Sequence, residues 1–311
     1  MSKILAVFGA SGQQGGSVLN YVLNDPELSS VYKVRAITRD VNSEKAKALQ
    51  GKAEVVQGDV SDRASLETAL TGVHTVFAMT TPSFEPNAFE IEVNGAKRIA
   101  DVAVEKGVEY FIFSTLPSIS TISGGKYPST NPFDSKAAAE QYIRGLPIKS
   151  SFYAPGSFIE NFQSYVFLAP RPVGDGTYVL ARHTSPKMQL PLLDAVGDTG
   201  KFVGAILAEP DKFEGKILHA AKALYDWEEI VAIMSKSSGK TIVYKQVSPE
   251  EFRATLPPPM ADIFVDYFGY LDEFGYYGPE TKELITRDAE HARGRLTTYE
   301  EYAELHPFQL E

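Results

Sequence analysis

Hydrophobic positions in the first half of the chain follow two alternating periods. Short runs rich in β-branched and aromatic residues are separated by longer segments in which apolar residues recur at helical spacing. In segment 13–24, for example, Val18, Leu19, Val22 and Leu23 fall on one face of a helix. This alternation predicts repeated βα units that build a parallel sheet.

The pattern places six strands in this half, with helices between them. We expect strands at 4–8, 33–38, 54–57, 75–79, 110–114 and 149–153, and helices at 13–24, 43–49, 64–70, 87–106 and 134–145. Right-handed crossovers in such a series place ligands at the carboxyl ends of the strands. Functional residues are therefore expected directly after each strand.

After residue 155 the pattern becomes irregular, with breakers at 170–176 (PRPVGDG) and 256–260 (LPPPM). We expect a helix at 225–235, a strand at 241–245, a helix opened by a capping box that starts at Ser248, and an aromatic-rich helix at 262–274. The predicted fold is α/β, with a doubly wound Rossmann sheet in 1–155. Residues 156–311 are expected to form a second, smaller α/β region, parts of which return to the Rossmann domain.

Aromatic residues in the last of these helices admit two interpretations. They can line a substrate pocket, or they can pack in the core, which is the commoner role of aromatics at helical spacing. We favour the core for these residues, which are Phe264, Tyr267, Phe268 and Tyr270.

Composition excludes several classes of function. The 311 residues include no cysteine, so disulfides, thiolate catalysis and zinc–thiolate sites are excluded. A net charge of −10 argues against direct binding of nucleic acid or an anionic membrane. His183 and His219 lack a second ligand at metal-binding spacing, and we predict no metal. Without an apolar run long enough to span a bilayer or an export signal, we expect a soluble protein in the cytoplasm, with nuclear entry beside a partner as the alternative.

A glycine-rich segment, FGASGQQGG at 8–16, lies between the first predicted strand and helix. Gly9 would turn the chain, Gly12 would let backbone N–H groups approach a pyrophosphate, and Gly15 would let the helix close on the strand. This arrangement predicts dinucleotide binding. The residues expected to contact the phosphates are Gly9, Ala10, Ser11, Gly12, Gln13, Gln14 and Gly15.

The end of the second strand indicates which dinucleotide binds. It reads Thr38-Arg39-Asp40, and a guanidinium there would pair with the 2′-phosphate of NADP(H), helped by the Thr38 hydroxyl. We therefore favour NADP(H), although an acidic residue such as Asp40 suits NAD(H). After the next two strands, the residues expected near the adenine are Asp59 and Val60, and those near the ribose and pyrophosphate are Thr80, Thr81 and Pro82.

Several motifs, in order, make a family resemblance specific. FGASGQQGGSV, ITRD, VVQGD, NPFDSK (131–136) and FIENF (158–162) resemble the NmrA-like family of atypical short-chain dehydrogenase/reductase proteins, most of all its NADPH-sensor branch. The resemblance covers most of the chain and is strongest over 4–165. It implies a Rossmann domain with a smaller α/β domain, NADP(H) binding, and often regulation through partner proteins such as transcription factors.

The sequence is compatible with two hypotheses about catalysis. Active short-chain reductases use Tyr-x-x-x-Lys, but Pro132 stands four residues before Lys136. In the first hypothesis, which we favour, Lys136 only bonds the nicotinamide ribose, and the protein acts as a regulator that reports the NADPH state through the loop 118–130 and the second region. In the second, Lys136 or the loop residue Tyr127 donates a proton to a small carbonyl, imine or unsaturated substrate held between the two regions.

Other candidates follow from strand ends and from the resemblance. Ser114 and Thr115 either orient a substrate carbonyl or cap the fifth strand. Asn94 matches the approximate place of a helix residue near the cofactor, or it is simply a solvated polar position. After the sixth strand, the residues expected at the nicotinamide end are Pro155, Gly156, Ser157 and Phe158. Whether the protein is an enzyme, and whether it is a monomer or a homodimer, stay open at this stage.

Overall fold

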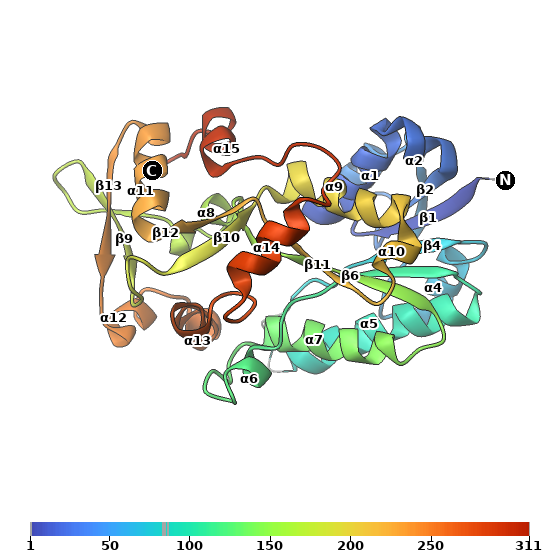
Figure 1. The fold of residues 1–311 in the computed structure, drawn as a ribbon, viewed down its shortest axis with the longest axis horizontal. Coiled ribbons are helices and arrows are strands. Elements are labelled where there is room, and N and C mark those ends of the chain that lie inside the picture. Colours follow the sequence, from blue (N-terminus) through green and yellow to red (C-terminus); the bar gives the residue numbers. More distant parts are fainter. Residues whose placement is uncertain (1, 83–84, 86, 311) are drawn as a thin grey trace.

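The computed structural model describes residues 2–82, 85 and 87–310, which form two lobes (Figure 1). One lobe is built on a seven-stranded sheet with strand order β11-β6-β5-β4-β1-β2-β3, and all its pairings are parallel. Its strands are β1 (Lys3–Phe8), β2 (Tyr32–Thr38), β3 (Glu54–Gln57), β4 (Thr75–Ala78), β5 (Tyr110–Ser114), β6 (Lys149–Pro155) and β11 (Ile217–Ala220). This is the predicted Rossmann sheet. Its strand order reverses between β1 and β4, where a ligand crevice is expected.

Helices cover both faces of this sheet. The helices of the lobe are α1 (Gln13–Asn24), α2 (Pro26–Val31), α3 (Glu44–Lys47), α4 (Arg63–Ala69), α5 (Ala88–Glu105), α6 (Ile119–Ile122), α7 (Asn131–Arg144), α9 (Ala195–Ala208) and α10 (Pro210–Phe213). On one face Val18, Leu19 and Val22 of α1 are buried with Phe202 and Ile206 of α9. On the other, side chains of α4, α5 and α7 form a second core against the same strands.

The second lobe contains two three-stranded sheets with short helices around them. The first sheet has the order β12-β10-β7 and the second β13-β9-β8. Their strands are β7 (Ser157–Phe158), β8 (Arg171–Pro172), β9 (Thr177–Arg182), β10 (Gln189–Leu193), β12 (Ala223–Asp226) and β13 (Thr241–Gln246). The helices are α8 (Asn161–Ser164), α11 (Trp227–Ser238), α12 (Pro249–Arg253), α13 (Pro258–Phe274), α14 (Thr281–Ala289), α15 (Tyr299–Leu305) and the 3₁₀ turn Val166–Leu168.

Two predicted helices begin earlier than the sequence pattern indicates, for the same reason. α7 begins at Asn131 instead of 134, and α13 begins at Pro258 instead of 262. Both carry proline in the first turn, where the missing N–H has no helical partner to lose. The predicted capping box at Ser248 is present, with the Ser248 hydroxyl accepting from the Glu251 N–H.

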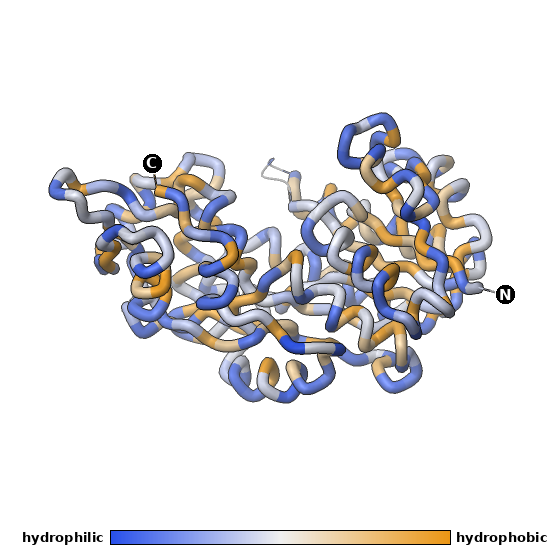
Figure 2. Tube along the Cα trace, turned by 90° about the horizontal axis from the view of Figure 1, so that it is seen from above, coloured by the Kyte–Doolittle hydropathy of each residue, from blue (hydrophilic) through white to orange (hydrophobic). Residues whose placement is uncertain are grey.

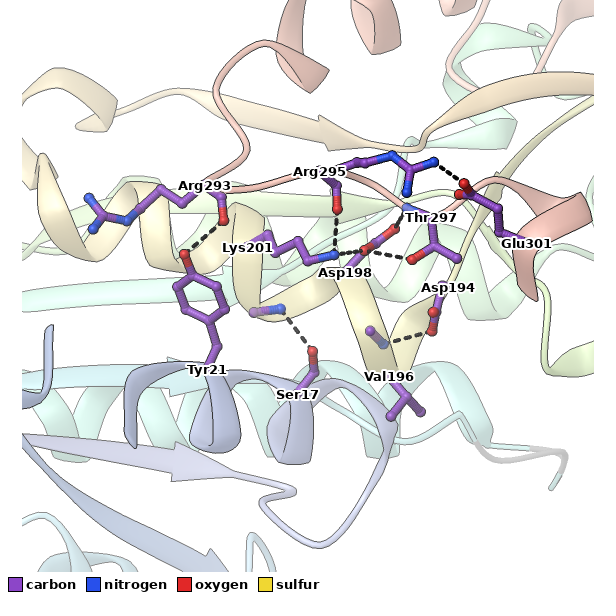
Figure 3. A network of polar contacts seen from close by, with 12 residues as sticks. Ser17, Tyr21, Asp194, Val196, Asp198, Lys201, Arg293, Arg295, Thr297 and Glu301 are labelled. Carbon is purple, nitrogen blue, oxygen red and sulfur yellow. Dashed lines mark hydrogen bonds and ion pairs between the residues drawn. The ribbon is translucent and has the colours of Figure 1, made fainter. Parts of the chain in front are cut away.

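Segments from the second half of the chain also build the Rossmann lobe, namely α9 and β11. A C-terminal strap that follows α14 then crosses back to them (Figure 3). The Tyr21 hydroxyl donates to the Arg293 carbonyl at 2.8 Å, and the fully buried Asp198 carboxylate accepts from the Thr297 N–H at 2.9 Å. These contacts tie the segment between α14 and α15 to α1 and α9.

Hydrophilic segments lie along the outside of both lobes, and hydrophobic segments run through their interiors (Figure 2). Within the part of the chain that is described, no helix is both long and apolar enough to cross a membrane.

Candidate functional site

The glycine segment forms a tight turn between β1 and α1. Gly9 has φ of +64°, a conformation that side-chain-bearing residues rarely adopt. A Cβ on Gly15 would lie 2.5 Å from the Phe8 carbonyl oxygen, so only glycine lets α1 approach β1 this closely. The cap residue Gly12 offers no side chain to the first N–H groups of α1, and the first turn carries no acidic residue. The positive end of the helix dipole therefore faces the crevice without a protein anion, which suits a pyrophosphate.

Arg39 follows β2 at the edge of the same crevice. Its exposed side chain makes no hydrogen bond or ion pair with any residue that the structure describes, and it can turn toward a ligand. Asp40, by contrast, accepts the Asn42 N–H at 2.8 Å within its own turn. Thr38 donates its hydroxyl to the Asp40 carbonyl at 3.3 Å. This geometry fits a 2′-phosphate at Arg39 better than a ribose hydroxyl at Asp40.

Asp59 stands beside this position, after β3. Its carboxylate accepts from both the N–H and the hydroxyl of Ser61 at 2.7 Å. These hydrogen bonds, and the nearby charges of Arg39 and Arg98, lower the pKa of the Asp59 carboxyl. The carbonyl oxygen of Val60 accepts a hydrogen bond from the Arg98 guanidinium and is therefore already engaged.

A cavity of about 360 Å³ lies at the carboxyl ends of the central strands, between the two lobes. Many residues predicted from the sequence line it, and these are Gln13, Gln14, Thr80, Thr81, Pro82, Ser114, Lys136, Pro155, Gly156, Ser157 and Phe158. A Cβ on Gly156 would collide with the Pro191 carbonyl of β10, so the backbone between β6 and β7 passes close to β10. The remaining loop and strand-end candidates do not line this cavity. They are Gly9, Ala10, Ser11, Gly12, Gly15, Thr38, Arg39, Asp59 and Val60.

Lys136 enters the cavity wall from α7 and is only 5% exposed. Its Nζ donates to the carboxylate of Glu92, which is equally buried on α5. The same carboxylate accepts from the hydroxyls of Ser135 and, at 2.6 Å, of Thr80. The cost of burying both charges is offset because the ammonium and the carboxylate pair with each other, and the two hydroxyls hydrogen-bond the remaining lone pairs of the carboxylate.

Glu92, the buried partner of Lys136, was not predicted from the sequence. The sequence does contain one indication of its role, because Glu92 shares a helix face with the apolar residues Ala88, Ala96 and Ile99. A carboxylate inside an apolar stripe needs a buried partner.

Asn94 lies on α5, outside the cavity. Its side chain is exposed on α5 and does not line the cavity. Two helical positions turn a side chain by about 200°, so Asn94 faces away when Glu92 faces inward.

Ser114 and Thr115 diverge at the end of β5. Ser114 lines the cavity and donates its hydroxyl to the Gln14 side-chain oxygen at 2.7 Å. Thr115 instead donates to Glu140 at 2.8 Å, outside this cavity. Of this pair, only Ser114 therefore presents its hydroxyl to the cavity.

Tyr127, the other candidate proton donor, is not brought to the cavity. Its hydroxyl donates to Glu273 at 2.9 Å, and its ring packs edge-on against Tyr270 and Phe274. Burial, together with the hydrogen bond to Glu273, raises its pKa to about 12. The loop that carries Tyr127 is held against α13, and the structure therefore does not support a catalytic role for this residue.

Aromatic side chains of the second lobe form the opposite wall of the cavity. Three of the four aromatics predicted on α13 line it, namely Phe264, Tyr267 and Phe268, whereas Tyr270 is fully buried outside it. The favoured core interpretation thus holds for Tyr270, and the other three also face the cavity. Further wall residues that the sequence analysis did not identify are Asn161, Phe162, Tyr165, Leu168, Arg182, Leu190, Trp227, Ile263 and Tyr276.

Comparisons with known proteins agree with this architecture. Residues 1–303 match the profile of the NmrA-like family. An NmrA-like family domain-containing protein of Dictyostelium discoideum is 30% identical over an alignment of 318 positions, which covers the full length of both chains. An NmrA-like family domain-containing oxidoreductase, FrzB of Cladobotryum sp, is 28% identical over 92% of this chain and 89% of its own.

A solved structure of NmrA, a negative transcriptional regulator, in complex with NADP has the same fold. It superposes with a TM-score of 0.82 at 23% identity, over 98% of this chain and 95% of the other. Two findings decide the family assignment. The family profile matches almost the whole chain, and one relative aligns over its full length. The chain belongs to the NmrA-like family.

Proposed function

We propose that this chain is an NADP(H)-dependent oxidoreductase whose substrate binds in the cavity between the lobes. One observation carries the proposal: the cavity joins the strand ends where a nicotinamide is expected to an aromatic wall from the second lobe. Its volume of about 360 Å³ suits a small organic molecule beside the nicotinamide.

Cofactor binding is assigned to the crevice next to this cavity. The uncapped N-terminus of α1 would hold the pyrophosphate, and Arg39 would hold the 2′-phosphate. When bound, NADPH supplies a hydride. The NADP complex of the similarly folded NmrA supports this assignment.

Lys136 is the residue that would act on the substrate. Glu92 takes one of its three N–H donors and keeps the ammonium group at the cavity wall. The remaining donors can hydrogen-bond a carbonyl or imine and transfer a proton to it as negative charge develops. The Ser114 hydroxyl and the aromatic wall would orient the substrate, and the aromatic wall would exclude water.

A regulatory role without turnover is the second candidate. Pro132 occupies the position of the usual tyrosine acid, and the Lys136 ammonium is already paired with Glu92. In that case the protein would report the NADPH state through a partner such as a transcription factor, and the cavity would only bind the nicotinamide.

A test of turnover separates the two functions. NADPH oxidation is followed against aldehydes, ketones, quinones and imines for the wild type, for Lys136→Met and for the exposed control Lys212→Met. Nucleotide binding is measured on all three proteins. Turnover that is lost only in Lys136→Met, with nucleotide binding retained, supports the oxidoreductase. Tight NADPH binding without turnover of any compound rejects it and leaves the regulatory role.

A further inference from the structure

Arg182 is the second buried cation of the cavity wall. It ends β9 and lines the cavity, yet only 3% of it is exposed to solvent. Within the described part of the chain, Lys136 and Arg182 are the charged residues that line this cavity. Their surroundings differ, because Lys136 has the Glu92 carboxylate and Arg182 has no carboxylate partner among the described ion pairs.

Neutral groups surround the guanidinium of Arg182. Its two terminal nitrogens donate to the backbone carbonyls of Ala181 at 2.7 Å and Leu168 at 2.5 Å. Aromatic rings of Trp227, Phe252 and Phe268 lie 5.3 to 5.4 Å from the guanidinium carbon. The Nε–H is buried without a hydrogen-bond partner among the described residues.

This arrangement leaves one positive charge in the cavity uncompensated. Cation–π contacts and two carbonyls offset part of the cost of burying it, but they do not neutralise it. Burial by itself lowers the pKa of the guanidinium, although an arginine remains charged at neutral pH. A guanidinium with unused donors in an apolar wall is suited to a planar, bidentate acceptor.

We propose that Arg182 is an anion subsite and that the substrate of this cavity carries a carboxylate on an apolar, aromatic-sized body. This inference rests on the proposed oxidoreductase and specifies its substrate class. The carboxylate would complete the hydrogen bonds of Arg182, while the aromatic wall holds the apolar body. The group to be reduced would then face Lys136 and the nicotinamide.

A matched pair of ligands tests the subsite without any change to the protein. Cinnamate and cinnamamide have nearly the same size and shape and differ in charge. We expect calorimetry on the wild type, with NADP⁺ present, to show cinnamate binding at least about tenfold tighter, as hydrogen bonds to charged groups imply. Equal affinities would overturn the proposal.

Two variants assign the preference to Arg182. Arg182→Met keeps the length and apolar contacts of the side chain, and it should abolish the preference for cinnamate while NADPH binding stays unchanged. Arg171→Met, an exposed arginine on the neighbouring strand β8, should keep the preference. A preference that survives in Arg182→Met would reject the subsite. Loss of the preference in that variant supports the subsite even if no compound is turned over, and absence of turnover would then reject only the oxidoreductase.

Discussion

The Lys136 ammonium donates to the Glu92 carboxylate inside the cavity wall, with both side chains removed from solvent. The pair joins α7 to α5 and so fixes the lysine relative to the strand ends. Removing one member would leave the other as an uncompensated buried charge, and this costs about 3–5 kcal/mol.

We therefore expect Glu92→Gln to lower the free energy of unfolding by a few kcal/mol and to reduce any turnover more than it weakens nucleotide binding. Urea unfolding and NADPH titration measure the two effects. Glu90→Gln, on the exposed face of the same helix, is the control and should change neither. The double variant Glu92→Gln with Lys136→Met should recover part of the stability, since neither charge is then left alone. A Glu92→Gln protein as stable as the wild type would contradict the ion pair.

Arg39 gives a prediction about nucleotide selectivity. Its exposed side chain makes no hydrogen bond or ion pair with the described residues, and only its charge acts on nearby Asp59, so its removal should disturb the fold little. We expect Arg39→Ala to weaken NADPH binding by about 10- to 100-fold, as for hydrogen bonds to a charged group, and NADH binding far less. Arg253→Ala, an exposed arginine in the second lobe, should bind both nucleotides as the wild type does. Equal losses for the two nucleotides in Arg39→Ala would disprove the 2′-phosphate assignment.

Local patterns allowed the Rossmann half to be predicted because each βα step carries its own signal. The strand after residue 3, the glycine turn and the apolar face of α1 are all contiguous in sequence. The cavity wall is different, because Arg182, Trp227 and Tyr267 lie on separate elements and meet only through tertiary packing. No sequence spacing relates them. Asn94 is a different case, because the apolar stripe of α5 could have indicated that its side chain faces away from Glu92.

Gly15 offers a test of the close approach between α1 and β1. An alanine Cβ there would overlap the backbone at the end of β1, which cannot move without disturbing the sheet. We expect Gly15→Ala to lower the free energy of unfolding by about 1–3 kcal/mol, the usual cost of overpacking, and to weaken NADPH binding. Gly16→Ala is a matched control, since its Cβ would lie 3.3 Å from the Ala10 carbonyl oxygen and alanine favours the helix. The melting temperature of Gly15→Ala should be clearly lower than that of Gly16→Ala. Similar melting temperatures would contradict the close contact between α1 and β1.

Asp288 makes the stability of the protein depend on pH in the acid range. Its carboxylate, on α14, accepts hydrogen bonds from the backbone N–H of His219 on β11 at 2.8 Å and from the Nδ1–H of the same residue at 2.7 Å, and it also pairs with Arg287. Burial opposes ionisation of this carboxyl, but the hydrogen bonds from His219 and Arg287 outweigh it and hold the pKa at about 2. The ordinary value is 3.8, so the folded state favours the charged form.

A carboxyl with a lowered pKa stabilises the fold above its unfolded pKa, and this stabilisation is lost as the pH falls through the folded value. For Asp288 the contribution is roughly 2 kcal/mol at neutral pH, and it should disappear between about pH 4 and pH 2. Asp288→Asn should therefore be less stable than the wild type at pH 7, and the two proteins should converge at the acid end. Urea unfolding over this pH range checks the prediction, with Asp211→Asn, an exposed aspartate, as the control. A stability difference between Asp288→Asn and the wild type that stays constant down to pH 2 would show that the carboxyl does not titrate as the His219 contact requires.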